Sequence, residues 1–260
     1  MSGITNGAYV LSNSEIQTFK DCRRKWWLGY YRKLKPNALK VEGPLALGSR
    51  VHEALDVYYT TQTPLLDAYH DLLTADTSVA IAHGLDTDKF YSEGDLGRIM
   101  LEGYLDWAAD EGIDADLEMI STEEVISMPM FNGEVELQGK LDMRVRRKAD
   151  GVRLFRDFKT ALNFADISTT AQLNEQVLTY MLLESQQIAD ENDRCDGGIF
   201  TVLRKVKRSA TAKPPFYKQV EVRHNIFTMR SFWDRIHGTV ADLMKTKTAL
   251  DQGVAHQLVA

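Results

Sequence analysis

The feature that most constrains the fold is a pair of adjacent segments in which polar and apolar residues alternate. From Val135 to Arg146 the odd positions are mostly apolar and the even positions are polar. A period of two residues is typical of a β-strand that buries one face. Residues 148–151 contain an Asp-Gly pair, the strongest short signal for a hairpin turn. A second strand over residues 152–160 would place Val152, Leu154 and Phe158 on one face and Asp157 and Lys159 on the other. The sequence therefore predicts an antiparallel hairpin in the middle of the chain.

The register of this hairpin determines which polar side chains meet. If Asp150-Gly151 is a two-residue turn, Asp142 lies opposite Lys159 and Arg144 lies opposite Asp157. Directly opposed residues project to the same face of a sheet. We therefore expect Asp142, Asp157 and Lys159 to converge on the polar face, and a longer turn keeps that face if it shifts the pairing by an even number.

Two carboxylates and a lysine on one face have a chemical use. A hard divalent cation such as Mg²⁺ binds one or two carboxylates together with waters and substrate phosphate. The cation polarises the phosphoryl oxygen and lowers the pKa of bound water, and a nearby lysine stabilises developing charge. The same residues also fit an exposed ion pair across the strands, worth ~1 kcal/mol or less.

The segments around the hairpin favour helices. Ser12 and Glu15 have capping-box spacing, and apolar residues recur every three or four positions as far as Tyr30. A second helix opens after Pro44, and residues 63–118 are helical and acidic before the period changes near Glu123. The prediction is one α/β domain over residues 1–260, with a central mixed β-sheet flanked by helices and a helical insertion at about 60–118.

Basic residues are concentrated in three segments, although the net charge is −6. Residues 20–35, 140–159 and 204–218 hold 21 of the 31 Lys and Arg but only 4 of the 37 acidic residues. Screening limits each charge to about 10 Å, so a local basic surface attracts phosphates whatever the total charge. Aromatic residues in the first segment add rings that could stack on bases, although Trp26 and Trp27 fit a core equally well. The predicted DNA-binding residues are Arg24, Lys25, Tyr30, Arg144, Arg204, Lys205, Lys207 and Arg208.

Other classes of protein fit the sequence poorly. The apolar runs are far shorter than the ~20 residues of a membrane helix, and the N-terminus has no signal-peptide pattern. Cys22 and Cys195 are too few for a disulfide framework, so a cytoplasmic protein of a bacterial cell or phage-infected host is expected. No GxxxxGK[ST] loop occurs, so any ATP-driven unwinding would come from a partner helicase.

Five short motifs in order give the sequence a family resemblance. Ser12 and Ser14 with Cys22 are followed by Gly48-x-x-x-His52, Gly139-x-x-Asp142, Asp157-x-Lys159 and Gln176-x-x-x-Tyr180. This order resembles the PD-(D/E)XK nuclease superfamily, and within it the RecB-like/Cas4-like exonuclease branch, over roughly residues 10–205. The resemblance implies a restriction-endonuclease-like core and a Mg²⁺- or Mn²⁺-dependent exonuclease in DNA recombination, repair or phage DNA metabolism.

The resemblance also assigns roles to individual residues. The implied metal ligands are His52, Asp142, Asp157 and the carbonyl of Phe158. Lys159 would be the catalytic lysine, and Gln176 and Tyr180 would position DNA or the attacking water. On a helix of about residues 171–188 these last two share a face, because they are four positions apart.

One departure from the family concerns iron. Related nucleases often bind an iron–sulfur cluster through one N-terminal and three C-terminal cysteines, and a cluster needs about four such ligands. Cys22 occupies the first position, but only Cys195 follows. We expect no cluster in this chain, which leaves open a branch without one or a truncated product.

Two alternatives remain open at this stage. The first is a catalytically silent DNA-binding or scaffold protein built on a nuclease core, against which the intact Asp142, Asp157 and Lys159 argue. The second is a metal hydrolase of small phosphate esters, against which the three basic segments argue. Metal-dependent degradation of linear DNA distinguishes them.

Overall fold

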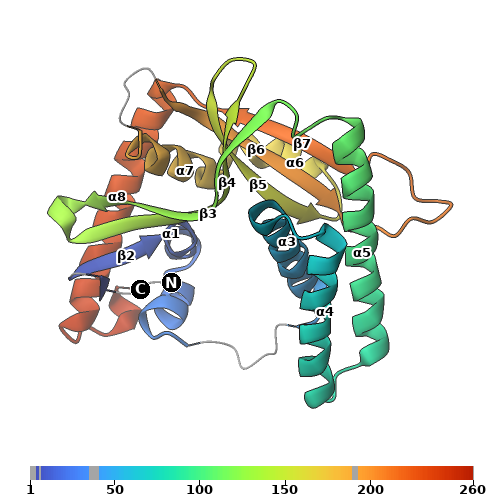
Figure 1. Cartoon of the computed structure of the whole chain (residues 1–260). Helices are drawn as coiled ribbons and strands as arrows, with labels where there is room; N and C mark the ends of the chain where they lie inside the picture. The colour runs from blue at the N-terminus through green and yellow to red at the C-terminus, as the bar shows by residue number, and fades with distance from the viewer. Residues whose placement is uncertain (1–3, 6, 35–40, 189–192, 260) are drawn as a thin grey trace.

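The computed structural model describes residues 4–5, 7–34, 41–188 and 193–259, which form one mixed β-sheet with helices on both faces (Figure 1). The strands are β1 (Ile4–Thr5), β2 (Ala8–Ser12), β3 (Leu117–Met130), β4 (Val135–Arg147), β5 (Arg153–Ala161), β6 (Cys195–Arg204) and β7 (Tyr217–Arg223). The helices are α1 (Asn13–Asp21), α2 (Arg23–Trp26), α3 (Gly43–Thr61), α4 (Leu65–Ala82), α5 (Thr87–Asp110), α6 (Ala165–Thr170), α7 (Glu175–Ser185) and α8 (Ile226–Asp251). Short turns of helix are η1 (Trp27–Tyr31), η2 (Phe131–Gly133), η3 (Ala171–Leu173) and η4 (His256–Leu258). The predicted α/β class, with a central mixed sheet between helices, is confirmed.

The sheet is forked at β4. Strand β3 pairs antiparallel with β4 from Val135 to Arg147 and so occupies one edge of that strand. The other edge is shared, because β2 pairs in parallel with residues 135–138 and β5 pairs antiparallel with residues 143–146. Strand β6 then lies parallel to β5, and β7 antiparallel to β6. Residues 139–142 therefore lie where β2 and β5 separate.

Hydrophobic cores lie on both faces of the sheet. Successive residues of a strand project to opposite faces, so Phe155 enters one core while Leu154 and Phe158 enter the other. The first core lies under α1, α7 and α8, and the second under α3, α4 and α5 (Figure 1). Burial on both faces explains why β6 is apolar from Ile199 to Leu203, apart from Thr201.

The predicted hairpin is present as β4 and β5, but its turn is longer than predicted. Residues 148–151 form the turn, and this shifts the register of the strands by two. The two predicted pairs, Asp142 with Lys159 and Arg144 with Asp157, are therefore wrong. Because the shift is even, the parity of the strands is unchanged, and Asp142 and Asp157 still approach each other.

The predicted N-terminal helix is interrupted. Cys22 has an extended backbone, with φ −161° and ψ 105°, and separates α1 from α2. Ser12 caps α1 by accepting the N–H of Glu15, as predicted. The carboxylate of Glu15, however, is fully buried and accepts hydrogen bonds from Tyr9 Oη at 2.5 Å and Trp26 Nε1 at 2.9 Å. This places Trp26 in the core, one of the two locations left open above.

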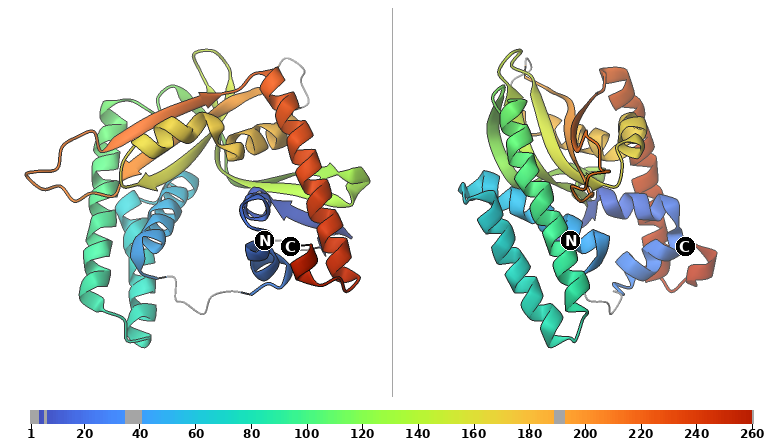
Figure 2. Two further views of the ribbon diagram at one scale, coloured as in Figure 1. Left: turned by 180° about the vertical axis from the view of Figure 1, so that it is seen from behind. Right: turned by 90° about the vertical axis from the view of Figure 1, so that its right-hand side faces the viewer.

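The region 60–118 is occupied mainly by α4 and α5. These helices run antiparallel beside α3 and extend away from the sheet (Figure 1 and Figure 2). The following strand begins at Leu117, earlier than the change of period near Glu123 indicated. Among the described residues, no helix is both long and apolar enough to cross a membrane.

A buried arginine joins these helices to the sheet. Arg156 of β5 has no exposed surface and donates to Thr201 of β6, Tyr104 of α5 and Asp114. Its guanidinium also lies 4.9 Å from the centre of the Phe158 ring. A buried charge is tolerated only when it is paired and hydrogen-bonded, and Arg156 meets both conditions.

Replacing Arg156 should therefore strongly destabilise the protein. We expect Arg156→Ala to lower the free energy of unfolding by about 3 kcal/mol or more, because Thr201 and Tyr104 lose their partner and a cavity forms. Urea denaturation measures the change. Arg98→Ala is the control, since its ion pair with Glu102 on α5 is half exposed and contributes about 0.5 kcal/mol or less. Equal losses in the two variants would contradict this role for Arg156.

Candidate active site

The candidate site lies at the fork of the sheet, where β4 and β5 separate beyond the pair Met143–Arg156. Past this point the side chain of Asp142 takes the place of a backbone acceptor, since its Oδ2 accepts the N–H of Phe158 at 3.0 Å. His52 approaches from α3, with Nε2 at 3.0 Å from Asp142 Oδ2 and 2.7 Å from the carbonyl oxygen of Phe158. An imidazole nitrogen, a carboxylate oxygen and a main-chain carbonyl therefore converge.

Helix α3 reaches the sheet because of a glycine one turn before His52. A Cβ atom on Gly48 would lie 2.9 Å from Thr160 Oγ1 of β5 and 3.6 Å from Lys205 Nζ. Real Cβ atoms almost never approach a neighbour so closely. The glycine of the Gly-x-x-x-His motif thus sets the distance at which His52 meets Phe158.

A second set of contacts runs from β5 to α7. Lys159 Nζ lies 2.5 Å from Asp157 Oδ2 and donates to Gln176 Oε1 at 3.2 Å. Gln176 Nε2 donates to the hydroxyl of Tyr180 at 2.9 Å, and that hydroxyl donates to the carbonyl of Lys140 at 2.8 Å. The four side chains form one continuous chain that fixes the orientation of the Gln176 amide and of the lysine.

Burial and neighbouring charges shift the pKa values of three side chains at the site. Burial raises the pKa of Asp157, which is 3% exposed, to about 6, with Lys159 opposing the rise and Asp142 adding to it. Burial alone lowers the pKa of His52, but the contacts with Asp142 and the Phe158 carbonyl outweigh it and raise the pKa above its usual value. Burial also raises the pKa of Tyr180, which keeps this phenol neutral.

The residues at the fork fit a hard divalent cation. Within the residues that the structure describes, no three His, Cys, Asp or Glu side chains are gathered closely enough to hold a metal by themselves. The set at the fork instead combines Asp142, His52 and the carbonyl of Phe158. Asp157 adds a buried Oδ2 that accepts no well-aligned hydrogen bond from the described residues, although it lies beside Lys159. Oxygen-rich sets of this kind suit Mg²⁺ and Mn²⁺.

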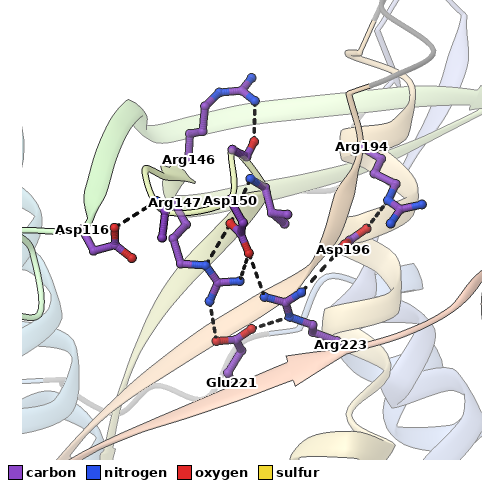
Figure 3. A network of polar contacts seen from close by, with 11 residues as sticks. Asp116, Arg146, Arg147, Asp150, Arg194, Asp196, Glu221 and Arg223 are labelled. Atoms are coloured by element: carbon purple, nitrogen blue, oxygen red, sulfur yellow. Dashed lines mark hydrogen bonds and ion pairs between the residues drawn. The ribbon is translucent and has the colours of Figure 1, made fainter.

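Most of the second basic segment, residues 140–159, is neutralised inside the protein. Except for Lys148, every Lys and Arg in it forms an ion pair. Figure 3 shows Arg147 between Asp150 of the turn and Glu221 of β7. Arg144 is 8% exposed and is paired with Glu184 of α7, so the prediction that it contacts DNA does not fit the structure.

The other predicted DNA-binding residues lie on two sides of the fork. Arg24 and Lys25 are exposed on α2 and Tyr30 is half-buried, whereas Lys35 of this segment is outside the described residues. The third segment forms the loop between β6 and β7, beside α5 (Figure 1). In that loop Arg204 donates to the carbonyls of Lys213 and Pro215, and Lys205 to that of Pro44. Lys207 donates to Ser92 of α5, and Arg208 donates to Tyr217.

Two acidic residues near His52 were missed by sequence analysis. Asp56 and Glu123 line the same narrow cavity as His52, Asp142 and Phe158. Asp56 follows His52 by four positions, so helical spacing carried a signal for it. Glu123 reaches the cavity through an unusual backbone conformation, which the sequence does not reveal.

Comparison with known proteins agrees with this geometry. The sequence matches the family model of the PD-(D/E)XK nuclease superfamily over residues 10–253, and the chain belongs to that superfamily. Nucleases of this superfamily generally use divalent metals.

Solved structures were also compared. The "Putative exonuclease" from Eubacterium rectale is similar with a TM-score of 0.56 and 10% identity, covering 92% of this chain and 82% of that one. The protein SSO0001 has a TM-score of 0.30 and 11% identity, with 88% and 82% covered, and carries no argument. No curated protein sequence matches. The likeness to the first structure shows the fold alone.

The buried carboxylate predicts a pH dependence of stability without metal. Because the folded pKa of Asp157 is above the usual 3.8, the neutral acid favours folding, and this contribution is lost as the pH rises through about 6. In EDTA we expect the stability of the wild type, relative to Asp157→Asn, to fall between pH 4 and pH 7. Urea denaturation measures the difference. A constant difference between the wild type and Asp157→Asn over this range would contradict the prediction.

Proposed function

We propose that the protein is a Mg²⁺- or Mn²⁺-dependent deoxyribonuclease that hydrolyses phosphodiester bonds of linear DNA as an exonuclease, in recombination, repair or phage DNA metabolism. The observation that carries the proposal is the convergence of His52, Asp142 and the Phe158 carbonyl beside the Asp157–Lys159 pair. Membership of a nuclease superfamily supports the chemistry. The name of the Eubacterium rectale protein and the RecB-like/Cas4-like motifs support the exonuclease assignment.

The proposed roles follow from the contacts. His52, Asp142, Asp157 and the carbonyl of Phe158 would hold the cation. When bound, a divalent cation polarises the phosphoryl oxygen and lowers the pKa of water. The other proposed roles, which are to orient the substrate and to stabilise developing charge, fall to side chains of the protein.

Lys159 is the residue proposed to act on the reacting phosphate. Its ammonium is held by Asp157 and Gln176, so it is pre-oriented and can donate to a phosphoryl oxygen as negative charge develops there. Gln176 in turn is fixed by Tyr180, whose hydroxyl is anchored on the Lys140 carbonyl. This rigid chain supports a role for Gln176 and Tyr180 in positioning the lysine and the substrate.

Replacing the central residues should abolish cleavage. Asp142→Asn, Asp157→Asn and Lys159→Met should each slow digestion of end-labelled linear DNA by about 100-fold or more in Mg²⁺ or Mn²⁺, because each removes a charge at the reacting phosphate. Lys148→Met is the control for the lysine, since among the described residues the ammonium of Lys148 donates to the carbonyl of Ala115 and forms no ion pair. Circular dichroism checks the fold of each variant.

The same assay separates the alternative function. A catalytically silent DNA-binding or scaffold protein would bind DNA but would degrade none with either metal, in the wild type as in the variants. The released products also report polarity and strand preference. A helicase or recombination partner remains part of the proposal and is tested by adding it to the same reaction.

DNA binding should depend on two of the three basic segments. Arg24 and Lys207 lie on exposed positions of the first and third segments. If each contacts one phosphate, the Arg24→Ala/Lys207→Ala variant should reduce the slope of log K against log salt by roughly 2 for duplex DNA. Fluorescence anisotropy in EDTA measures this without cleavage. Lys148→Ala, on the exposed turn between β4 and β5, should leave the slope unchanged. An unchanged slope in the double variant would show that these are ordinary solvated surfaces.

A further inference from the structure

Strand β3 has an irregular residue across from Asp142. Thr122 pairs with Met143 and Glu124 with Leu141, while the pairing skips Glu123. The φ of Glu123 is 50°, in the left-handed region that side-chain-bearing residues adopt only at a cost in free energy. Such a conformation persists where the surrounding structure enforces it, and it is concentrated at functional sites.

Glu123 borders the candidate cation site. It lines the narrow cavity that His52, Asp142 and Phe158 also line. Its carboxylate is 19% exposed and forms an ion pair with Lys140, whose own side chain is 59% exposed. A half-buried carboxylate beside a cation site is thus neutralised by an ammonium with an open path to solvent.

The ion pair alone does not explain a glutamate at this position. A pair with one largely exposed member returns little free energy, less than the left-handed conformation costs. Glycine at position 123 would remove that cost. The ion pair therefore leaves a glutamate with this backbone conformation unexplained.

We propose that Glu123 supplies a further carboxylate to the divalent cation and that Lys140 is the counter-charge it exchanges when the cation binds. This inference rests on the proposed function and adds a residue to its site. Hard divalent cations take carboxylate oxygens as ligands, directly or through water. The negative charge of Glu123 would then be paired with Lys140 in the absence of metal and with the cation in its presence. A half-buried carboxylate requires such a partner.

The test is calorimetric titration of Mn²⁺ into the full chain without DNA. Glu123→Gln should weaken Mn²⁺ binding about 10- to 100-fold, because the amide keeps the shape but loses the charge. Lys140→Met should tighten binding severalfold, because no ammonium competes for Glu123. In the Glu123→Gln background Lys140→Met should have no effect. Glu118→Gln, an exposed glutamate of the same strand, is the matched control and should bind as the wild type does.

A second variant separates metal binding from stability. Glu123→Gly removes both the carboxylate and the unfavourable φ, so we expect a higher melting temperature together with weaker Mn²⁺ binding. A purely structural Glu123–Lys140 pair predicts instead that both single variants melt earlier and bind Mn²⁺ as the wild type does. That result would overturn the inference.

The remaining outcomes are also decisive. If Lys140→Met tightens binding equally in both backgrounds, the lysine acts only through its long-range field and the exchange is wrong. If Glu123→Gln binds normally while Asp142→Asn does not, Glu123 is no ligand and the proposed function stands. If the wild type binds no Mn²⁺, the proposed function itself fails.

Discussion

The structure depends on how the fork in the sheet is closed. Two strands cannot share one edge of β4 without a point at which they part, and there the main-chain groups of Phe158 lose their ladder partners. Unpaired main-chain groups inside a protein are costly, and the great majority find a partner. Here Asp142 accepts the N–H of Phe158 and His52 lies within hydrogen-bonding distance of its carbonyl oxygen. The groups that end the ladder are thus the groups that can hold a cation.

Strand β5 connects this closure to both halves of the molecule. Its alternate residues Arg156 and Phe158 face α3 and α5, where Tyr59 stacks on the Phe158 ring at 5.7 Å and Arg156 reaches Tyr104. Asp157 and Lys159 face the other way, toward Gln176 of α7. A period of two therefore separates a structural anchor from a chemical site within four consecutive residues. The contacts of Arg156 and of the Phe158 ring hold this part of β5 in place, although ionisation of the adjacent buried Asp157 disfavours the folded state.

The sequence predicted those parts of the fold that depend on local periodicity. Alternation identified β4, whose apolar residues are buried, and β5, although residues of β5 enter the cores on both faces of the sheet. The order of short motifs identified His52, Asp142 and Lys159 as members of one predicted site. The register was wrong by two, because turn length depends on contacts such as Arg147 with Glu221, which come from distant strands. The ion pair of Arg144 with Glu184 and the left-handed backbone of Glu123 were not predictable for the same reason. Periodicity does not report which distant residues meet.

The internal ion pairs also limit which basic segments can supply the phosphate contacts that the proposed function requires. The segment with the most Lys and Arg, residues 140–159, crosses the sheet, and its charges are neutralised by acids from β3, α7 and β7. The exposed charge of the other two basic segments lies on α2 on one side of the fork and on the loop between β6 and β7 on the other (Figure 1). Exposed charges act over about a Debye length, so under the proposed function these two flanks would matter more to a bound phosphate backbone than the net charge of −6 does. A phosphate backbone attracted to both flanks would pass over the strands that carry Asp142 and Lys159, which is where the proposed chemistry requires it.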